Sequence, residues 1–181
     1  MIGFGIFLIL IFAFYEGARR GTALQLVYSA GFILSFFIAG KFYRGLGEKI
    51  ELYVPYLSVT QETEMTFYNQ AMSFDLGQAY YAGVAFIGIV FVGWMLTKFI
   101  GIFLSSLRFY KVFRDDWIIS GILNVLLVYT LIFLVMTLLT TIPVEMIQGM
   151  FAKSSTARVI VENTPYLSDY FHQLWIADII H

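Results

Sequence analysis

Four long apolar stretches, almost free of charge, constrain the fold of this chain more than any other feature of its sequence. They cover approximately residues 2–16, 22–40, 79–107 and 117–144. The only charged residues inside them are Glu16, which ends the first stretch, and Lys98 in the third. A transmembrane helix needs about 20 mostly apolar residues. The short first stretch therefore spans the membrane only if side chains at its ends snorkel to the interface or if the bilayer thins locally. We therefore predict an all-α, polytopic membrane protein whose four transmembrane helices form two hairpins.

The composition supports a lipid environment and excludes several functions. Hydrophobic residues make up 60% of the chain and charged residues 13%, whereas soluble domains have about 45–50% apolar and about 25% charged residues. A net charge of −1 argues against nucleic-acid binding. The chain has no Cys, and its two His residues are isolated in the tail, so we expect no disulfide and no metal site. We also predict no cofactor and no catalytic residue, and hence no enzyme.

The distribution of basic residues predicts the orientation of the helices. The short links "EGARR" and "RFYKVFRDD" contain two and three basic residues, respectively. Positively charged short loops lie on the cytoplasmic side of a membrane. Both termini, the long connection 41–78 and the tail 145–181 are then expected to be extracytoplasmic.

The tail has the pattern of an amphipathic helix. Its apolar positions recur at helical spacing: they are Leu167, Tyr170, Phe171, Leu174 and Trp175. Such a helix either packs on the transmembrane bundle of the same chain or offers a docking surface to a partner.

The first link combines charge with small residues. Arg19 and Arg20 either act only as a topology signal or also bind phosphate or carboxylate groups through their planar guanidinium groups, as a two-pronged fork of donors. Ala13, Gly17 and Gly21 form a row of small residues at helical spacing. Such a row permits close helix packing, which we expect within the first hairpin.

Two polar residues inside the apolar stretches also need an explanation. Lys98 either snorkels to the cytoplasmic interface or faces the bundle, where it pairs with Glu16. Asn124 can form a hydrogen bond between helices, worth about 1 kcal/mol.

Three segments resemble the CvpA family, the colicin V production proteins. The first is "GARRG" with the following "LQLVYSAGFILSFFIAGKF", and the second is "LRFYKVFRDDWIISGILNVLLVYTLIF". In the second, Asp116 occupies the acidic position of the family, and Ser120 and Gly121 occupy its first small position. Asn124 stands where relatives often have Gly. The tail segment "VENTPYLSDYF" is the third similarity.

The resemblance implies a multi-pass protein of the bacterial inner or plasma membrane, with roles in toxin (bacteriocin) production and in surface phenotypes such as biofilm formation. We expect an accessory or scaffold protein that supports toxin production or export and envelope homeostasis. The alternative is a homo-oligomeric channel or transporter for ions or small solutes. The expected partners are the lipid bilayer and a membrane or envelope protein, and the alternative adds further copies of the chain. The candidate functional residues are Glu16, Gly17, Arg19, Arg20, Gly21, Lys98, Asp116, Gly121 and Asn124.

Overall fold

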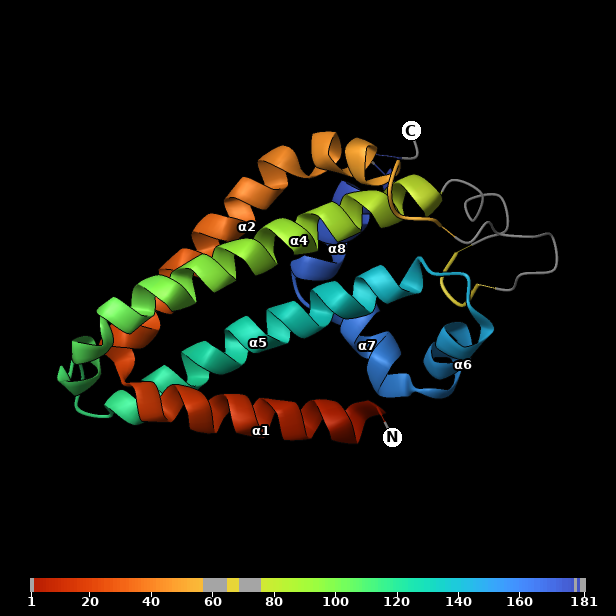
Figure 1. Cartoon of the computed structure of the whole chain (residues 1–181). Coiled ribbons are helices and arrows are strands. Elements are labelled where there is room, and N and C mark those ends of the chain that lie inside the picture. Colours follow the sequence, from red (N-terminus) through yellow and green to blue (C-terminus); the bar gives the residue numbers. More distant parts are fainter. Residues whose placement is uncertain (1, 57–64, 69–75, 178, 180–181) are drawn as a thin grey trace. The chain divides into compact units, whose positions relative to one another are not determined.

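A computed structural model describes residues 2–56, 65–68, 76–177 and 179, and every regular element in these residues is helical. In chain order (Figure 1) the elements are α1 (Ile2–Arg20), α2 (Thr22–Ile50), α4 (Leu76–Phe103), η1 (Ser105–Phe109), α5 (Asp116–Thr140), α6 (Glu145–Lys153), α7 (Ser155–Asn163), α8 (Leu167–His172) and η2 (Gln173–Ala177). The helices α1, α2, α4 and α5 are long and apolar enough to span a membrane. The predicted all-α class with four membrane-spanning helices is therefore confirmed.

The helix bounds differ from the predicted ones, because the predicted bounds follow the apolar residues and some polar residues are also helical. The first helix continues through the charged "EGARR" to Arg20, and only Gly21 interrupts the helical backbone before α2. The second helix runs ten residues beyond the predicted end at residue 40, through turns that contain charged residues. Residues 76–78 belong to α4, so the predicted connection 41–78 is shorter than expected, and its residues 57–64 and 69–75 lie outside the described part.

The ends of α4 and α5 also come earlier than predicted. The helix α4 stops at Phe103 and is followed by the short helix η1. The helix α5 ends at Thr140, three residues before Pro143, because proline has no N–H and disfavours a helical residue before it. The side chain of Gln148 then donates to the carbonyl oxygens of Thr140 and Ile142 at 3.2 and 2.9 Å. The Thr140 carbonyl is one of the acceptors that the helix end leaves unpaired.

The chain divides into two compact units. Unit 1 comprises Met1–Gly3, Phe42–Ile87 and Phe133–His181, and unit 2 comprises Phe4–Lys41 and Gly88–Ile132.

In unit 2, small residues bring helices together. Gly31 and Ser35 of α2 lie against Thr97 and Gly93 of α4, and α1 runs along α5 (Figure 1). Phe12 of α1 is 66% exposed, as suits a side chain that faces lipid.

Aromatic residues of the tail form the core of unit 1. Phe171 and Trp175 are fully buried and lie 5.2 and 5.7 Å, centroid to centroid, from the ring of Phe86 on α4. Phe171 also lies 5.8 Å from the ring of Phe133 on α5. Of the two predictions for the tail, packing on the chain's own helices therefore agrees with the structure.

The tail is not one continuous helix. It consists of α6, α7, α8 and the π-helical turn η2. Ser154 separates α6 from α7, and its hydroxyl accepts a hydrogen bond from the backbone N–H of Ala157 at 3.3 Å, as an N-cap does. Tyr166, with a φ of 62°, precedes α8.

Candidate functional site

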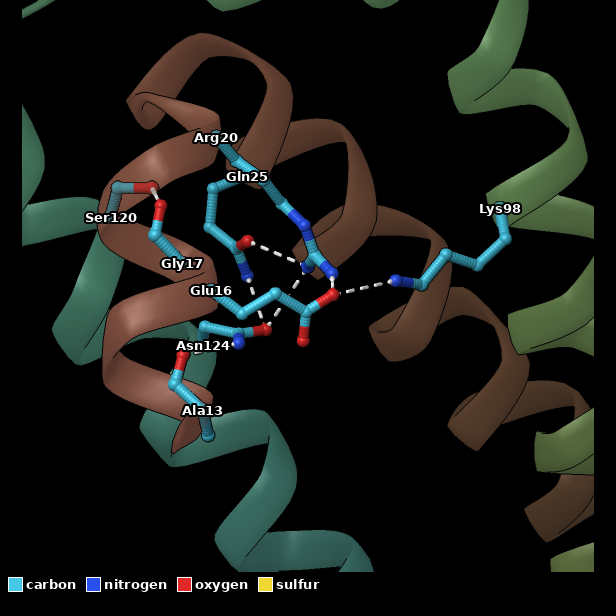
Figure 2. A network of polar contacts seen from close by, with 8 residues as sticks. All are labelled: Ala13, Glu16, Gly17, Arg20, Gln25, Lys98, Ser120 and Asn124. Atoms are coloured by element: carbon cyan, nitrogen blue, oxygen red, sulfur yellow. Dashed lines mark hydrogen bonds and ion pairs between the residues drawn. The ribbon is translucent and has the colours of Figure 1, made fainter. Parts of the chain in front are cut away.

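Five polar side chains of unit 2 meet between the helices α1, α2, α4 and α5 (Figure 2). We call them the charged cluster: Glu16, Arg20, Gln25, Lys98 and Asn124. Four of them were predicted as candidate or pairing residues from the sequence, whereas Gln25 was not. A polar side chain within an apolar span is the signal that could have identified it.

Arg20 is the centre of the cluster. Its guanidinium forms an ion pair with Glu16 one turn earlier on α1. It also donates to the side-chain oxygens of Gln25 and Asn124, each at 3.3 Å, and lies 4.8 Å from the centroid of the Tyr28 ring. The side chain is only 12% exposed. A single guanidinium thus connects α1 with α2 and α5, which its planar set of donors makes possible.

Asn124 connects α5 to both helices of the first hairpin. Its Nδ2 donates to the backbone carbonyl of Ala13 at 2.7 Å, and its Oδ1 accepts from Gln25 Nε2 at 3.3 Å and from Arg20. The side chain is 4% exposed. The predicted interhelical hydrogen bond is therefore present.

Lys98 faces the other charged side chains. Its Nζ lies 3.5 Å from Glu16 Oε1, the oxygen that Arg20 also contacts. The ammonium lies 5.0 and 5.2 Å from the centroids of Tyr28 and Trp94, as cation–π contacts require. Of the two predictions for Lys98, the pair with Glu16 is therefore present. Two cations share one carboxylate, so the three charged groups carry one net positive charge.

The small residues of α1 pack against α5. The Ser120 hydroxyl donates to the carbonyl of Gly17 at 2.5 Å. A Cβ on Gly17 would lie 2.6 Å from Asn124 Cβ, and one on Gly121 would lie 2.6 Å from the Phe14 ring. The prediction that this row packs within the first hairpin is wrong for Gly17, because its contacts are with α5.

Asp116 and Thr22 form a second polar contact between helices in unit 2, beside Gly21. Asp116 Oδ2 accepts from the backbone N–H of Thr22 at 2.8 Å, and its Oδ1 accepts from the N–H of Val112 at 3.0 Å. The Thr22 hydroxyl donates to the Asp116 carbonyl at 2.8 Å. The carboxylate thus satisfies a donor that the first turn of α2 leaves unpaired. Gly21 has a φ of 77° and a Cβ there would lie 3.2 Å from Asp116 Oδ2, so both conformation and space favour glycine.

The structure separates the two adjacent arginines. Arg19 is exposed, and it contacts the Tyr15 hydroxyl at 3.3 Å and the face of the same ring. Its backbone carbonyl accepts from Arg108 Nε at 3.1 Å. Only Arg20 enters the charged cluster, so the two side chains do not form one binding fork.

The chemistry of the cluster is that of charge-assisted hydrogen bonds between helices. Within residues 2–56, 65–68, 76–177 and 179, no three His, Asp or Glu side chains are placed to hold a metal ion. Polar contacts of this kind hold membrane helices together, since apolar surfaces gain nothing from leaving lipid.

Comparison with known proteins places the chain in a family. The family model described as Colicin V production protein matches residues 2–165. The uncharacterized transmembrane protein YshB of Bacillus subtilis (strain 168) is 31% identical over 179 residues, which cover 97% of this chain and 97% of that protein. No solved structure matches. The chain is thus a membrane protein that belongs to the colicin V production protein family.

Proposed function

We propose that this protein is an accessory or scaffold protein of the bacterial plasma membrane that supports bacteriocin production or export and envelope homeostasis. It acts through a membrane or envelope protein partner and carries out no catalysis of its own. The family supports the link to toxin production. The observation that carries the scaffold role is the charged cluster, whose side chains bind one another across four helices.

The cluster suits a scaffold because it makes a rigid unit out of helices that lipid alone would not hold together. Arg20 and Asn124 direct their polar atoms inward, while large apolar side chains remain exposed, for example Phe4, Phe37 and Phe103. An outer surface of this kind contacts lipid and can bind the apolar helices of a partner protein.

The role in toxin production is tested in a bacteriocin-producing host. Deletion of the gene should lower bacteriocin activity in the culture supernatant, and a plasmid copy should restore it. We also expect Arg20→Ala to fail in complementation, because it removes the central contact of the cluster, whereas the matched variant Arg19→Ala should complement. Unchanged supernatant activity in the deletion strain would contradict the proposal.

The partial exposure of the ion pair between Glu16 and Lys98 favours a second candidate, a homo-oligomeric channel or transporter. The side chains of Glu16 and Lys98 are 43% and 31% exposed, although both lie within membrane-spanning helices. Charged groups at such positions often line ion or solute pathways. The mass of the protein in nanodiscs, followed by ion flux in liposomes, distinguishes the candidates. A monomer without flux supports the scaffold, whereas an oligomer whose flux Glu16→Gln abolishes supports the channel.

We also propose that both termini are extracytoplasmic, because the two short links contain the densest basic charge. The chain has no Cys, so an introduced residue is its only thiol. Ser155→Cys in the tail should react with an impermeant thiol reagent in intact cells, whereas Ala18→Cys should react only after the cells are permeabilised. The reverse pattern would refute this orientation.

A further inference from the structure

The charged cluster has a surplus positive charge that is accessible from outside the helices of unit 2. Glu16 Oε1 contacts both the Arg20 guanidinium and Lys98 Nζ, so one carboxylate balances only one of the two cations. The Arg20 side chain is 12% exposed, whereas those of Glu16 and Lys98 are 43% and 31% exposed. A group outside the helices therefore reaches the surplus charge at Lys98.

The Lys98 ammonium has more donors than acceptors. An ammonium carries three donor hydrogens. Among the described residues, its only hydrogen-bond acceptor is Glu16 Oε1, and the distance of 3.5 Å is long for such a bond. The rings of Tyr28 and Trp94 attract the charge but offer no acceptor oxygen in line with it. An anionic group that approaches from the exposed side would supply the missing acceptors and neutralise the surplus charge.

The position of the cluster along the helices places it at the level of lipid headgroups. The helix α1 has 19 residues and is therefore about 28 Å long, close to the thickness of about 30 Å of the hydrocarbon layer. Its last turn, from Glu16 to Arg20, then lies at the edge of that layer, next to the headgroups. Lys98 reaches the same level, because its side chain extends from α4 to Glu16 (Figure 2).

Exposed apolar side chains continue from both charged residues toward the middle of the membrane. Phe12 lies one turn before Glu16 on α1 and is 66% exposed. Trp94 lies one turn before Lys98 on α4 and is 37% exposed. Its ring stacks on that of Phe91, which is 54% exposed, with 5.9 Å between the centroids. Residues four apart share a helix face, so an accessible apolar surface adjoins the accessible cation.

We propose that the charged cluster binds the phosphate of an anionic phospholipid at Lys98, with an acyl chain of the lipid against Trp94 and Phe91. A zwitterionic lipid brings its own cation with the phosphate, so the surplus charge favours an anionic one. A carboxylate on a partner helix could also neutralise Lys98. The headgroup level of the cluster and the adjoining apolar surface favour the lipid. This ligand goes beyond the scaffold and channel candidates and depends on neither of them.

Native mass spectrometry of the full-length protein in detergent tests the lipid site. The protein is titrated with dimyristoyl phosphatidylglycerol and, separately, with dimyristoyl phosphatidylcholine, which has the same acyl chains but no net charge. We expect the first binding event to be about fivefold or more tighter for the anionic lipid. Glycerol 3-phosphate, which has the phosphate but no acyl chain, should not displace the lipid at equal concentration.

Four variants locate the site, and a melting curve checks that each is folded. Lys98→Gln removes the surplus charge and should abolish the preference for the anionic lipid, whereas Lys98→Arg should keep it. The matched control is Lys111→Gln, which makes the same change in net charge at an exposed lysine of the link and should also keep it. Glu16→Gln adds surplus charge and should increase the preference about fivefold, a change that a purely structural role would not produce.

Several results would overturn the proposal. These are equal binding of the two lipids by the folded protein, an unchanged preference in Lys98→Gln, or the same loss in Lys111→Gln as in Lys98→Gln, which would indicate diffuse attraction. Displacement of the lipid by glycerol 3-phosphate at equal concentration would also overturn it, because the ligand would then be a free phosphate ester.

Discussion

The substitution Asn124→Leu tests whether the charged cluster holds the helices of unit 2 together. Leucine has the same branching and the same number of side-chain heavy atoms as asparagine, but no polar atoms. It removes the 2.7 Å bond to the Ala13 carbonyl and the two 3.3 Å bonds from Gln25 and Arg20. The Gln25 side chain is fully buried, so its amide nitrogen loses a partner that water does not replace.

The expected cost follows from these distances. Hydrogen bonds between membrane helices contribute about 0.6 kcal/mol on average and at most about 1.7 kcal/mol. The short bond to Ala13 belongs near the upper value, and each long bond near the average. We therefore expect Asn124→Leu to lower the free energy of unfolding by about 2–3 kcal/mol. The matched control is Thr130→Val, which removes one bond within α5, from an exposed hydroxyl to the Leu126 carbonyl. It should cost less than about 0.5 kcal/mol.

Reversible unfolding by SDS in mixed micelles gives both free energies. A double-mutant cycle with Gln25→Leu then isolates the contact between the two amides, for which we expect a coupling of about 0.5–1 kcal/mol. If Asn124→Leu is as stable as Thr130→Val, or if the effects of Asn124→Leu and Gln25→Leu are additive, the cluster does not hold the helices together.

Three further predictions use the same unfolding assay. Arg20→Lys should cost about 1–2 kcal/mol because an ammonium cannot replace the guanidinium at three partners, and Arg19→Lys should stay within about 0.5 kcal/mol; equal losses would show that only charge matters. Gly17→Leu should cost about 3 kcal/mol or more through overpacking against α5, whereas Gly5→Leu, with open space around its Cβ, should be tolerated; two tolerated variants would contradict the close approach of α1 and α5. Phe171→Ala should cost about 3–5 kcal/mol because its ring is fully buried, and an unchanged stability would mean that the tail is dispensable.

Hydropathy by itself was sufficient to predict the class of this protein and its four membrane-spanning helices. Transfer of a segment into lipid depends on the residues of that segment, so apolar runs can be recognised without knowledge of their neighbours. The ends of the helices were harder to predict from the sequence, because hydropathy reports on the hydrocarbon layer and not on the backbone hydrogen bonds. The continuation of α2 to Ile50 through polar residues is an example.

Only the tertiary structure determined which polar groups meet. Arg19 and Arg20 are neighbours in the sequence, but successive helical residues point about 100° apart, so one is exposed and the other enters the charged cluster. Likewise, Gly17 contacts Ser120 of α5, which is more than 100 residues away in the chain. The helical spacing of the small residues on α1 contains no information about that partner. The sequence alone thus determined which segments enter the membrane, whereas the packing of their faces decided which side chains form the site.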